Sequence, residues 1–452
     1  MKFEFSKEYF DRLRDAIQES NHAFVTQSMQ EVNPADISSL LYEFNTEEAK
    51  YVIDHLDREV GAEIISYIEE DTRSRFLHNY EPEEVAKFID YIDSDDAADI
   101  LNDLPVKFKD KVILHMENQE KASYILELMR YDEDCAGGLM AKELIKANLN
   151  WTIVQCIEEI RRQAENVEKI FTVYVVDNRG KLLGRVSLKR IILADDKARI
   201  ADIYEPDIVS VETSLEEQEV ADIIQKYDLE VVPVVNVQGK LVGRITVDDI
   251  LDVITEMAEQ ERNMMAGISE EIEEDDSVWV LTRARLPWLI VGMIGGIFAA
   301  KFIGIFEDNP LLIPAMAFIP LIMATSGNVG IQSSTIMVQT LATRSFFYGS
   351  YARRIFKVVI VALLNAIILS GLVLVVNLFT DVNNSLSFIV SLALFSVVVL
   401  ASFTGTATPL LLDRIGINPA FATGPIITTF NDLLGLSVYF GIAQYFQASG
   451  WI

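Results

Sequence analysis

An acidic residue, Asp432, lies well inside an apolar segment near the end of the chain. A carboxylate within a membrane-spanning helix is costly unless it faces water or a partner, so it marks a functional site by default. Thr428 is four residues earlier and shares its helix face, and Pro425 frees a backbone carbonyl group one turn before. These groups predict a stripe of oxygen atoms. The alternative is that Asp432 is buried and joins two helices through a hydrogen bond.

A second polar cluster, Thr325–Ser334, interrupts an earlier apolar segment with the sequence TSGNVGIQSS. Its small residues would allow two helices to approach closely. Asn328 and Gln332 are four residues apart, so their carboxamide groups share one helix face. They are therefore candidate pore residues together with Asp432. A packing seam held by amide hydrogen bonds is the alternative, and for Gln332 it is an equally good interpretation.

The residue types of the apolar half suit a hard cation. Mg2+ prefers oxygen ligands, keeps several of its waters and is often bound by one or two carboxylates through them. No His follows His115, and Cys135 and Cys156 precede the apolar half, so a side-chain site for a soft ion is not expected there. A single Asp432 per chain would be doubled by a two-fold axis along a pore, which predicts a homodimer.

Charge is distributed unevenly along the 452 residues. The chain carries 38 basic and 68 acidic residues, of which eight and five follow position 280, so residues 1–280 have a net charge of −33. Such a segment repels nucleic-acid phosphates and attracts cations, which argues against nucleic-acid partners. The simpler alternative is an ordinary acidic domain. The first residues, MKFEFSKEYFDRLRDAI, lack the apolar core of a signal peptide, so this half is expected to be cytoplasmic.

Between Ile37 and Leu128 the sequence predicts short helices. Stretches such as DISSLLYEF, EAKYVIDHL and EVAKFIDYI carry apolar residues at i, i+3 and i+4. Helices this short are unstable alone, so neighbours must stack on one another. The pattern predicts an α-helical, superhelical N-terminal domain built from helix hairpins.

An internal repeat follows, in which strands and helices alternate. Phe171–Leu188, FTVYVVDNRGKLLGRVSL, aligns without a gap with Glu230–Val247, EVVPVVNVQGKLVGRITV. In each copy an apolar strand leads into a glycine-containing turn, a second strand and a helix. The arrangement resembles a tandem pair of CBS modules, an intracellular α/β regulatory fold.

Five apolar segments in the last part of the chain approach or exceed the roughly 20 residues that cross a bilayer. They are Leu286–Phe306, Pro314–Ala342, Phe356–Phe379, Leu386–Leu412 and Phe421–Phe446. Seven of the eight basic residues in this region lie on one side of these segments, and the positive-inside rule makes that side cytoplasmic. We therefore expect a polytopic α-helical membrane domain with five transmembrane helices, inserted in the cell (inner or plasma) membrane.

The whole chain resembles the MgtE family of magnesium channels. The most specific marks are Pro320–Gln332 (PLIMATSGNVGIQ) and Pro425–Gly435 (PIITTFNDLLG), together with the domain order. The resemblance implies a homodimer with the pore between the subunits, and hydrated Mg2+ bound at the residue that matches Asp432. It also implies that cytoplasmic Mg2+ closes the pore by bridging acidic surfaces of the N-terminal domain, the CBS pair and a connecting helix. Some members also bind ATP in the CBS pair.

The resemblance also assigns domain boundaries and sensor residues. The expected domains are residues 1–137 (helical and acidic), 138–262 (CBS modules 138–200 and 201–262), 263–285 (a connecting, plug-like helix) and 286–452 (the pore domain). The expected cytoplasmic Mg2+ sensor comprises Asp90, Asp93, Asp95, Asp96, Asp99, Asp248, Asp249, Asp252, Glu256 and Glu259. The family usually carries a denser acidic run after the CBS pair than this chain does. For each single residue, an ordinary solvated helix face is the alternative.

A nucleotide site is implied by the same resemblance. Gly243–Asp249, GRITVDD, is similar to the CBS pattern in which Thr246 meets a phosphate and Asp249 holds the ribose. The first copy, Gly184–Arg190, reads GRVSLKR and lacks the acid. At most one adenosine site per chain is therefore expected.

Two other function classes remain as alternatives to a Mg2+ channel. A secondary exchanger that couples Mg2+ or Co2+ to Na+ or H+ would need a second carboxylate in the membrane, where only Asp432 is available. A membrane enzyme would need a nucleophile or a paired acid and base near the membrane surface. The sequence contains no such constellation, since Asp413 and Arg414 are more simply a loop ion pair, and we expect no enzyme activity.

Overall fold

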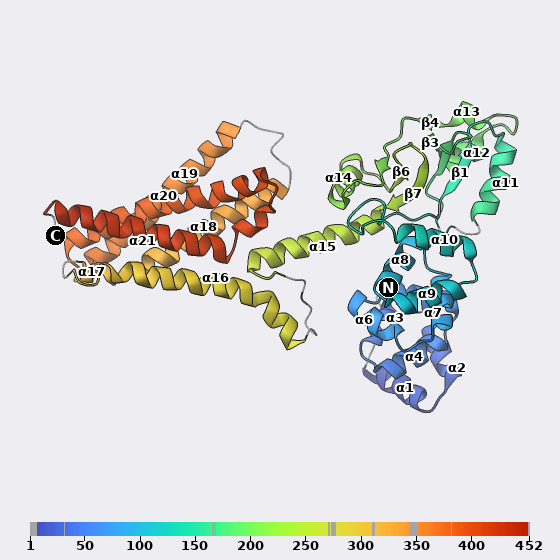
Figure 1. Ribbon diagram of the computed structural model, residues 1–452, viewed down its shortest axis with the longest axis horizontal. Helices are drawn as coiled ribbons and strands as arrows, with labels where there is room; N and C mark the ends of the chain where they lie inside the picture. The colour runs from blue at the N-terminus through green and yellow to red at the C-terminus, as the bar shows by residue number, and fades with distance from the viewer. Residues whose placement is uncertain are drawn as a thin grey trace. The chain divides into compact units, whose positions relative to one another are not determined.

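The computed structural model describes the chain except residues 1–6, 31, 165, 166, 168, 270, 271, 273–276, 310, 311, 343–350, 381, 451 and 452. The chain divides into two compact units, Met1–Ile254 and Thr255–Ile452 (Figure 1). The first unit contains short helices and two small sheets, whereas the described part of the second unit is helical. Arg344, a basic residue used for the predicted orientation, and the acidic stretch at 270–276 apart from Ile272 lie outside the described residues.

The first unit opens with short helices that follow a regular repeat. The described helices are α1 (Lys7–Gln18), α2 (His22–Met29), α3 (Pro34–Leu41), α4 (Thr46–Asp54), α5 (Arg58–Ser66), α6 (Glu70–Leu77), α7 (Pro82–Ile89), α8 (Ser94–Asn102), α9 (Val106–His115) and α10 (Gln119–Leu128). The first residues of α3, α5, α7 and α9 are 24 positions apart, and so are those of α2, α4, α6 and α8. Each repeat is thus one helix hairpin, which buries its apolar face only against its neighbours.

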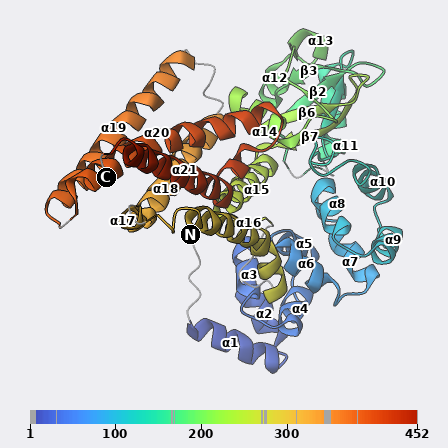
Figure 2. The same cartoon turned by 60° about the vertical axis from the view of Figure 1, so that its left-hand side comes forward.

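Equivalent hydrogen bonds join neighbouring repeats. The side chains of Thr26, Lys50 and Ser74 each donate to a backbone carbonyl group 29 residues ahead, over 2.9, 2.9 and 3.2 Å. Helices α3, α5, α7 and α9 pack in one row, and α6, α8 and α10 pack in a second row (Figure 2). The predicted superhelical stack of helix hairpins is confirmed.

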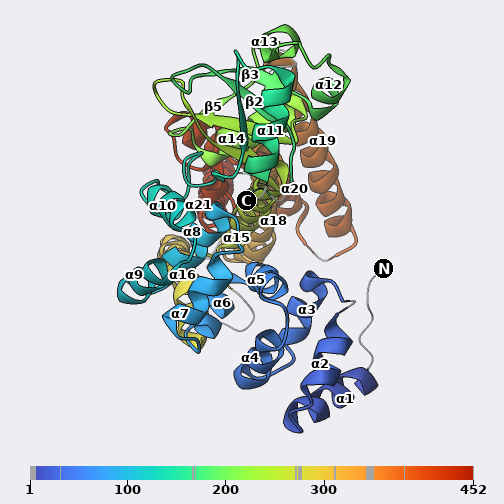
Figure 3. The same ribbon diagram turned by 90° about the vertical axis from the view of Figure 1, so that its right-hand side faces the viewer.

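The repeated sequence forms two small sheets. The first has the strand order β1 (Ile145–Asn148), β2 (Val173–Val176), β3 (Leu182–Val186) and β4 (Glu205–Pro206), and the second has β5 (Val211–Glu212), β6 (Val231–Val235) and β7 (Leu241–Thr246). In both sheets the first pair of strands is parallel and the second pair is antiparallel. Helices α11 (Ile153–Gln163), α12 (Leu188–Leu193) and α13 (Ile200–Ile203) accompany the first sheet, and α14 (Glu217–Tyr227) accompanies the second (Figure 3).

The turns within the two β-hairpins match each other in detail. Asp177 Oδ1 and Asn236 Oδ1 each accept hydrogen bonds from the backbone N–H groups two and four residues later. Gly180 and Gly239 have positive φ angles of 79° and 72°, which other residues rarely adopt. Two backbone hydrogen bonds of 3.0 Å join one turn to the other. The register predicted for the repeat, and the CBS pair, are therefore confirmed.

The two CBS modules are packed differently. The first has a core of its own, to which Ile153 and Val175 belong, whereas the core of the second, with Val232 and Ile245, is continuous with that of the N-terminal helices. The segment before β1 also pairs with the second module, since the Ala141 N–H donates to the Arg244 carbonyl group over 2.8 Å. The expected boundary between residues 137 and 138 falls inside this paired segment. The N-terminal helices and the second module thus share one hydrophobic core.

The helix that leaves the CBS pair differs from the prediction. Helix α15 runs without interruption over Val247–Ala266 and ends before Gly267, whose φ of 77° suits the close of a helix. A separate connecting helix was expected at 263–285, but residues 263–266 complete α15 and α16 begins only at Val278. The expectation was wrong here because nothing in the sequence before Gly267 stops α15, so α15 itself joins the two units.

The second unit is a bundle of long helices. They are α16 (Val278–Gly304), α18 (Ile319–Ala342), α19 (Tyr351–Leu378), α20 (Asn384–Arg414) and α21 (Pro425–Ala448), with the short helices α17 (Ile313–Met316) and η3 (Pro419–Ala422) between them. Helices α18, α20 and α21 pack against one another, α19 packs on α20, and α16 packs on α21 (Figure 1).

Four helical segments among the described residues are long and apolar enough to cross a membrane. They are Val278–Gly304, Phe356–Leu378, Asn384–Arg414 and Pro419–Ala448. Helix α18 is 24 residues long, but its polar cluster Thr325–Ser334 lowers its hydropathy, and it is not among the four. The second unit therefore contains four candidate membrane-spanning segments, and the fifth transmembrane helix stays a prediction.

Candidate functional site

Asp432 lies where α21 packs against α18. Its side chain is partly buried, and the hydroxyl group of Ser326, a buried residue of α18, donates to Asp432 Oδ1 over 3.4 Å. This distance is long for a hydroxyl–carboxylate hydrogen bond, so the carboxylate keeps most of its capacity for another ligand. One turn earlier, the Thr428 hydroxyl group donates to the Gly424 carbonyl oxygen over 2.9 Å. Asp432 and Thr428 thus present their oxygen atoms on one face of α21.

Glycine in α18 permits this close approach. A Cβ atom at Gly327 would lie 3.2 Å from Asp432 Oδ1 and 3.0 Å from Thr428 Cγ2. At Gly330, one turn further on, a Cβ atom would overlap with the side-chain amide of Asn431. The small residues of the polar cluster in α18 therefore allow α18 and α21 to approach closely at Asp432.

Asn431 is not among the residues predicted from the sequence. Its side chain is only 1% exposed, and Oδ1 accepts a hydrogen bond of 2.6 Å from the Thr404 hydroxyl group on α20. Its Nδ2 atom has no hydrogen-bond partner among the described residues. The residue therefore holds α21 against α20 immediately beside Asp432. A second polar residue next to Asp432 was a usable signal, although its partner on another helix could not be deduced from spacing.

Asn328 and Gln332 lie away from that contact. Both side chains are exposed on α18, and no hydrogen bond to Asp432 is formed by either in the described part of the chain. Within one chain the structure therefore brings together Asp432, Thr428 and Ser326, but not the two carboxamides.

A second candidate site lies in the first unit, where α8 meets the second CBS module. Asp93, Asp95 and Asp96 occupy the N-terminal turn of α8. Asp93 Oδ2 lies 3.6 Å from Nη2 of Arg244, a buried residue of β7. Asp95 is only 8% exposed, and its Oδ1 atom has no hydrogen-bond partner among the described residues. An unpaired buried carboxylate oxygen of this kind is costly unless a cation or proton reaches it.

The carboxyl groups of this cluster hold protons more tightly than isolated ones. Burial, followed by repulsion from Asp96, raises the pKa of Asp95 well above its usual range. Burial and then Asp249 raise the pKa of Asp96 to about 6, and burial and then Asp96 raise the pKa of Asp99 to about 7. Burial also raises the pKa of Asp249. Acids of the N-terminal helices and of the CBS pair thus act on one another, and a bound cation would relieve their repulsion.

The remaining predicted sensor residues have other surroundings. Asp90 accepts hydrogen bonds from the backbone N–H groups of Glu117 and Asn118 over 2.9 and 3.3 Å, which is a structural role at the start of α10. Four further acids are exposed along α15: Asp248, Asp252, Glu256 and Glu259. Their spacing places them on one side of this helix.

Two further residues of this region were not predicted. Glu143, which is 8% exposed, accepts hydrogen bonds from the backbone N–H and the hydroxyl group of Ser94 over 3.3 and 2.6 Å. Lys121, 9% exposed, donates to the Asp90 carbonyl oxygen over 3.0 Å, and burial lowers its pKa. Ser94 and Glu143 are 49 residues apart, so no local pattern could have indicated that they fasten α8 to the segment before β1.

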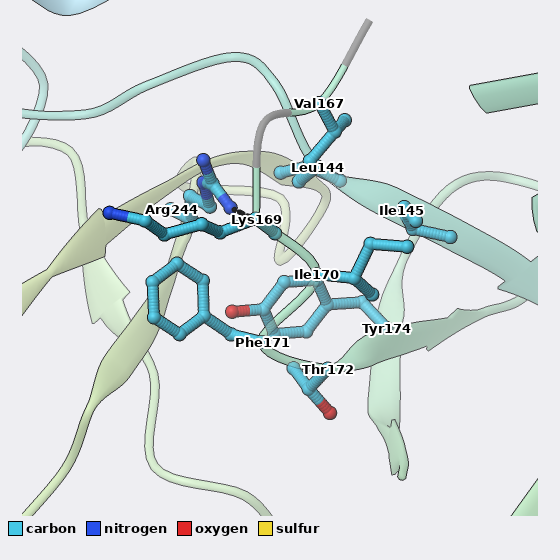
Figure 4. Close-up of a pocket in the computed structure, with 9 residues that line it drawn as sticks. All are labelled: Leu144, Ile145, Val167, Lys169, Ile170, Phe171, Thr172, Tyr174 and Arg244. Atoms are coloured by element: carbon cyan, nitrogen blue, oxygen red, sulfur yellow. Dashed lines mark hydrogen bonds between the residues drawn. The ribbon is translucent and has the colours of Figure 1, made fainter. Parts of the chain in front are cut away.

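The residues expected to bind a nucleotide contact each other. The backbone N–H and the hydroxyl group of Thr246 donate to Asp249 Oδ2 over 2.9 and 2.7 Å, which caps the start of α15. A separate cavity of about 10 Å3 lies between the modules, beside Lys169, Phe171, Tyr174 and Arg244 (Figure 4). Such a cavity holds about one water molecule and is therefore too small for a nucleotide.

Direct metal ligation is not preformed in the described part of the chain. No three His, Cys, Asp or Glu side chains there stand in a geometry that could hold a metal ion. An ion at either candidate site would therefore bind through its waters, or after side chains move. Mg2+, which dehydrates reluctantly, fits the first of these modes.

Comparison with known proteins assigns the chain. The MgtE divalent cation transporter model matches residues 319–442, the MgtE intracellular N domain matches 32–134, and the CBS domain matches 136–197 and 200–256. The magnesium transporter MgtE of Thermus thermophilus is 35% identical over 320 residues, which cover 70% of this chain and 71% of that protein. The chain belongs to the MgtE family. The family predicted from the sequence is thereby confirmed.

Other MgtE proteins support the same assignment. The magnesium transporter MgtE of Enterococcus faecalis is 33% identical over 329 residues, or 73% of this chain and 72% of that protein. A crystal structure of the cytosolic domain of the Mg2+ channel MgtE in complex with ATP is 32% identical, with a TM-score of 0.51, and covers 54% of this chain and 99% of that one. The matched models describe a divalent cation transporter with an intracellular N domain and CBS domains.

Proposed function

We propose that this MgtE protein is a Mg2+-selective channel that takes up magnesium across the cell (inner or plasma) membrane. The observation that carries the proposal is the carboxylate of Asp432, partly buried between α21 and α18 in a unit whose helices can span a membrane. A carboxylate in that setting attracts a cation and can hold it through its hydration waters. Two relatives of which this chain covers more than two thirds, those of Thermus thermophilus and Enterococcus faecalis, are magnesium transporters.

The pore would form between two copies of the chain. In this arrangement α18 is the fifth transmembrane helix, and its polar face, with Asn328 and Gln332, lines the pore instead of facing lipid. The exposure of both side chains in a single chain supports this role, because an exposed amide within a bilayer needs water or a partner. A homodimer also places two Asp432 carboxylates around one ion path.

Cytoplasmic Mg2+ would close the pore through the acidic half. Burial raises the pKa values of Asp95 and Asp96, and repulsion from neighbouring carboxylates, including that of Asp249, raises them further when no cation is bound. An ion that binds only when these groups are close stabilises the compact, closed arrangement. The exposed acids of α15, Asp248, Asp252, Glu256 and Glu259, would extend the same sensor towards the second unit.

ATP is proposed as a regulatory ligand of the CBS pair. The similar cytosolic domain of a Mg2+ channel MgtE was crystallised with ATP. In this chain Thr246 and Asp249 would have to bind the nucleotide while their mutual hydrogen bonds cap α15, or give up these hydrogen bonds in order to bind it. Binding of a fluorescent ATP analogue to the intact protein, compared with Thr246→Ala, tests this assignment.

Uptake by proteoliposomes tests the channel itself. The intact chain, Asp432→Ala and Asp413→Ala are reconstituted, and Mg2+ entry is followed with an internal indicator and no Na+ or proton gradient. We expect entry driven by the Mg2+ gradient alone, lost in Asp432→Ala and retained in Asp413→Ala, an exposed acid at the end of α20. Entry that requires a counter-gradient would favour the exchanger alternative. Unchanged entry in Asp432→Ala would restrict Asp432 to joining α21 and α18.

A further inference from the structure

Helix α16 is longer than the membrane is thick. Its 27 residues extend about 40 Å, whereas the hydrocarbon core of a bilayer is about 30 Å thick. Arg285 and Lys301 are separated by a helix length of about 24 Å, and their long side chains let both charges reach opposite boundaries of that core. The turns that precede Arg285 must therefore extend into one headgroup layer.

These first turns carry an exposed apolar stripe with one arginine in it. The stripe consists of Val278, Leu281, Thr282, Arg285, Leu286 and Leu289, which line a groove of about 350 Å3 on α16. Their spacing of three and four residues places them along one helix face. A different face, with Ala284 and Trp288, packs into the unit, where Trp288 stacks on Phe421. The stripe is therefore not used in packing within the described chain.

The charge on the stripe has no counter-charge among the described residues. Arg285 is exposed and forms no ion pair with a described side chain. Val278 and Leu289, on either side of it, are 82% and 66% exposed, which would be unfavourable in water. Trp279 is 73% exposed at the same level, and tryptophan is enriched at the membrane–water boundary.

We propose that Val278–Leu289 binds an anionic phospholipid of the cytoplasmic leaflet. The phosphate group lies at Arg285, and an acyl chain lies along the apolar stripe. Charge complementarity favours this occupant, because the cytoplasmic leaflet is anionic and attracts basic groups next to a transmembrane helix. The stripe also continues directly into the spanning part of α16. The inference requires that α16 crosses the membrane, and it does not depend on which ion the pore conducts.

Native mass spectrometry of the full-length protein tests the proposal. The protein is released from vesicles that contain equal amounts of phosphatidylglycerol and phosphatidylcholine, and the bound lipids are identified. We expect phosphatidylglycerol to be retained in preference, with this preference several-fold weaker in Arg285→Gln and unchanged in Arg414→Gln. Arg414, at the end of α20, is the matched control because it is exposed on the same expected side of the membrane. Equal retention of both lipids, or a preference that survives Arg285→Gln, would overturn the proposal.

Tryptophan fluorescence distinguishes the other occupants of the stripe. Phosphatidylglycerol brominated near its headgroup should quench the intact protein more strongly than brominated phosphatidylcholine, and Trp279→Phe should remove most of the difference. If a second copy or the acidic half of the chain covers the stripe, neither lipid quenches Trp279 and the proposal fails. Displacement of phosphatidylglycerol by inorganic phosphate would also contradict it, because a free anion would then be the ligand.

Discussion

The carboxylates of the two candidate sites meet different partners. Asp432 stands by itself against a neutral hydroxyl group, that of Ser326, whereas Asp95 lies among other acids, of which Asp93 is 3.6 Å from Arg244. A conducting site must hold its ion weakly enough to release it, which a single carboxylate that contacts the ion through water would allow. In a crowded cluster, a bound cation removes repulsion between the carboxylates, so stronger repulsion leads to tighter cation binding. The first arrangement suits passage of an ion and the second suits sensing of one.

Replacing the most buried acid of the cluster tests this distinction. The raised pKa of Asp95 means that its ionised form destabilises the folded unit at neutral pH. This effect vanishes at pH values below the pKa that Asp95 has in the unfolded chain. We expect Asp95→Asn to stabilise the metal-free protein by about 1 kcal/mol and to reduce the stabilisation that Mg2+ adds. Thermal unfolding of the full-length protein with and without Mg2+ measures both. Asp110→Asn, an exposed acid of α9, is the control. A lower unfolding temperature in Asp95→Asn without Mg2+ would show that Asp95 acts as a counter-ion.

Single residues differed in how far the sequence could predict them. Asp432 could be identified as a candidate because one charge in an apolar segment needs no structural context. Asn431 and Glu143 were not, because their roles depend on Thr404 and Ser94, which lie on other elements. For Asp95, the sequence identified an acid but not that its Oδ1 atom is buried without a partner.

At the scale of elements, the contact between α18 and α21 determines the surroundings of Asp432. Gly327 leaves just enough room for the Asp432 and Thr428 side chains. We expect Gly327→Ala to lower the Mg2+ uptake rate by about tenfold, equivalent to about 1.4 kcal/mol in the barrier, because the added methyl group displaces the carboxylate. The control is Gly371→Ala on α19, where a Cβ atom meets nothing within 4 Å. Equal uptake by the two variants would mean that the α18–α21 contact does not position Asp432.

The acids of α8 should make Mg2+ sensing depend on pH. Asp96 and Asp99 have pKa values of about 6 and about 7, so protons occupy them at mildly acidic pH and both are ionised above neutrality. Without a cation, the compact arrangement should lose stability as the pH rises through this range, since each raised pKa penalises the ionised form. Protons and Mg2+ then both favour the compact arrangement, so we expect half-maximal closure to need less Mg2+ at about pH 6 than at about pH 8. Asp96→Asn with Asp99→Asn should flatten this dependence, and an unchanged dependence would assign it to other groups.

Elements were predictable where the pattern was local. The CBS register followed from two matching hairpins, and the helix hairpins followed from apolar spacing. The helix starts of α2 to α9 also repeat every 24 residues along the sequence. What repeats is the position of the residues that pack against neighbouring helices, and not the identity of those residues. The end of α15 was misplaced because only Gly267 terminates that helix.

At the scale of the whole molecule, the excess of acidic residues and the long apolar helices lie in different parts of the chain, which correspond roughly to the two units. Residues 1–280 carry a net charge of −33, and in the part of the chain that the structure describes, the helices that can span a membrane follow position 277. The N-terminal helices share one core with the second CBS module, so a cation bound among their acids acts on a single folded body. Helix α15 begins in that body and ends in the second unit, which makes it the covalent route from the proposed sensor to the proposed pore.

Removing the sensing body should therefore leave an unregulated pore. A chain that begins at Val247 retains α15 and the second unit, whose helices form a separate hydrophobic core. We expect its Mg2+ uptake into proteoliposomes to be insensitive to Mg2+ on the cytoplasmic side, whereas the intact chain is inhibited, because the acids of α8 are absent and nothing stabilises the closed arrangement. Adding Asp432→Ala to the shortened chain should abolish uptake, which shows that the same pore is measured. If the shortened chain were still fully inhibited by Mg2+, the sensor would have to lie within α15 or the second unit, and the acids of the first unit would serve only to bind α8 to the CBS pair.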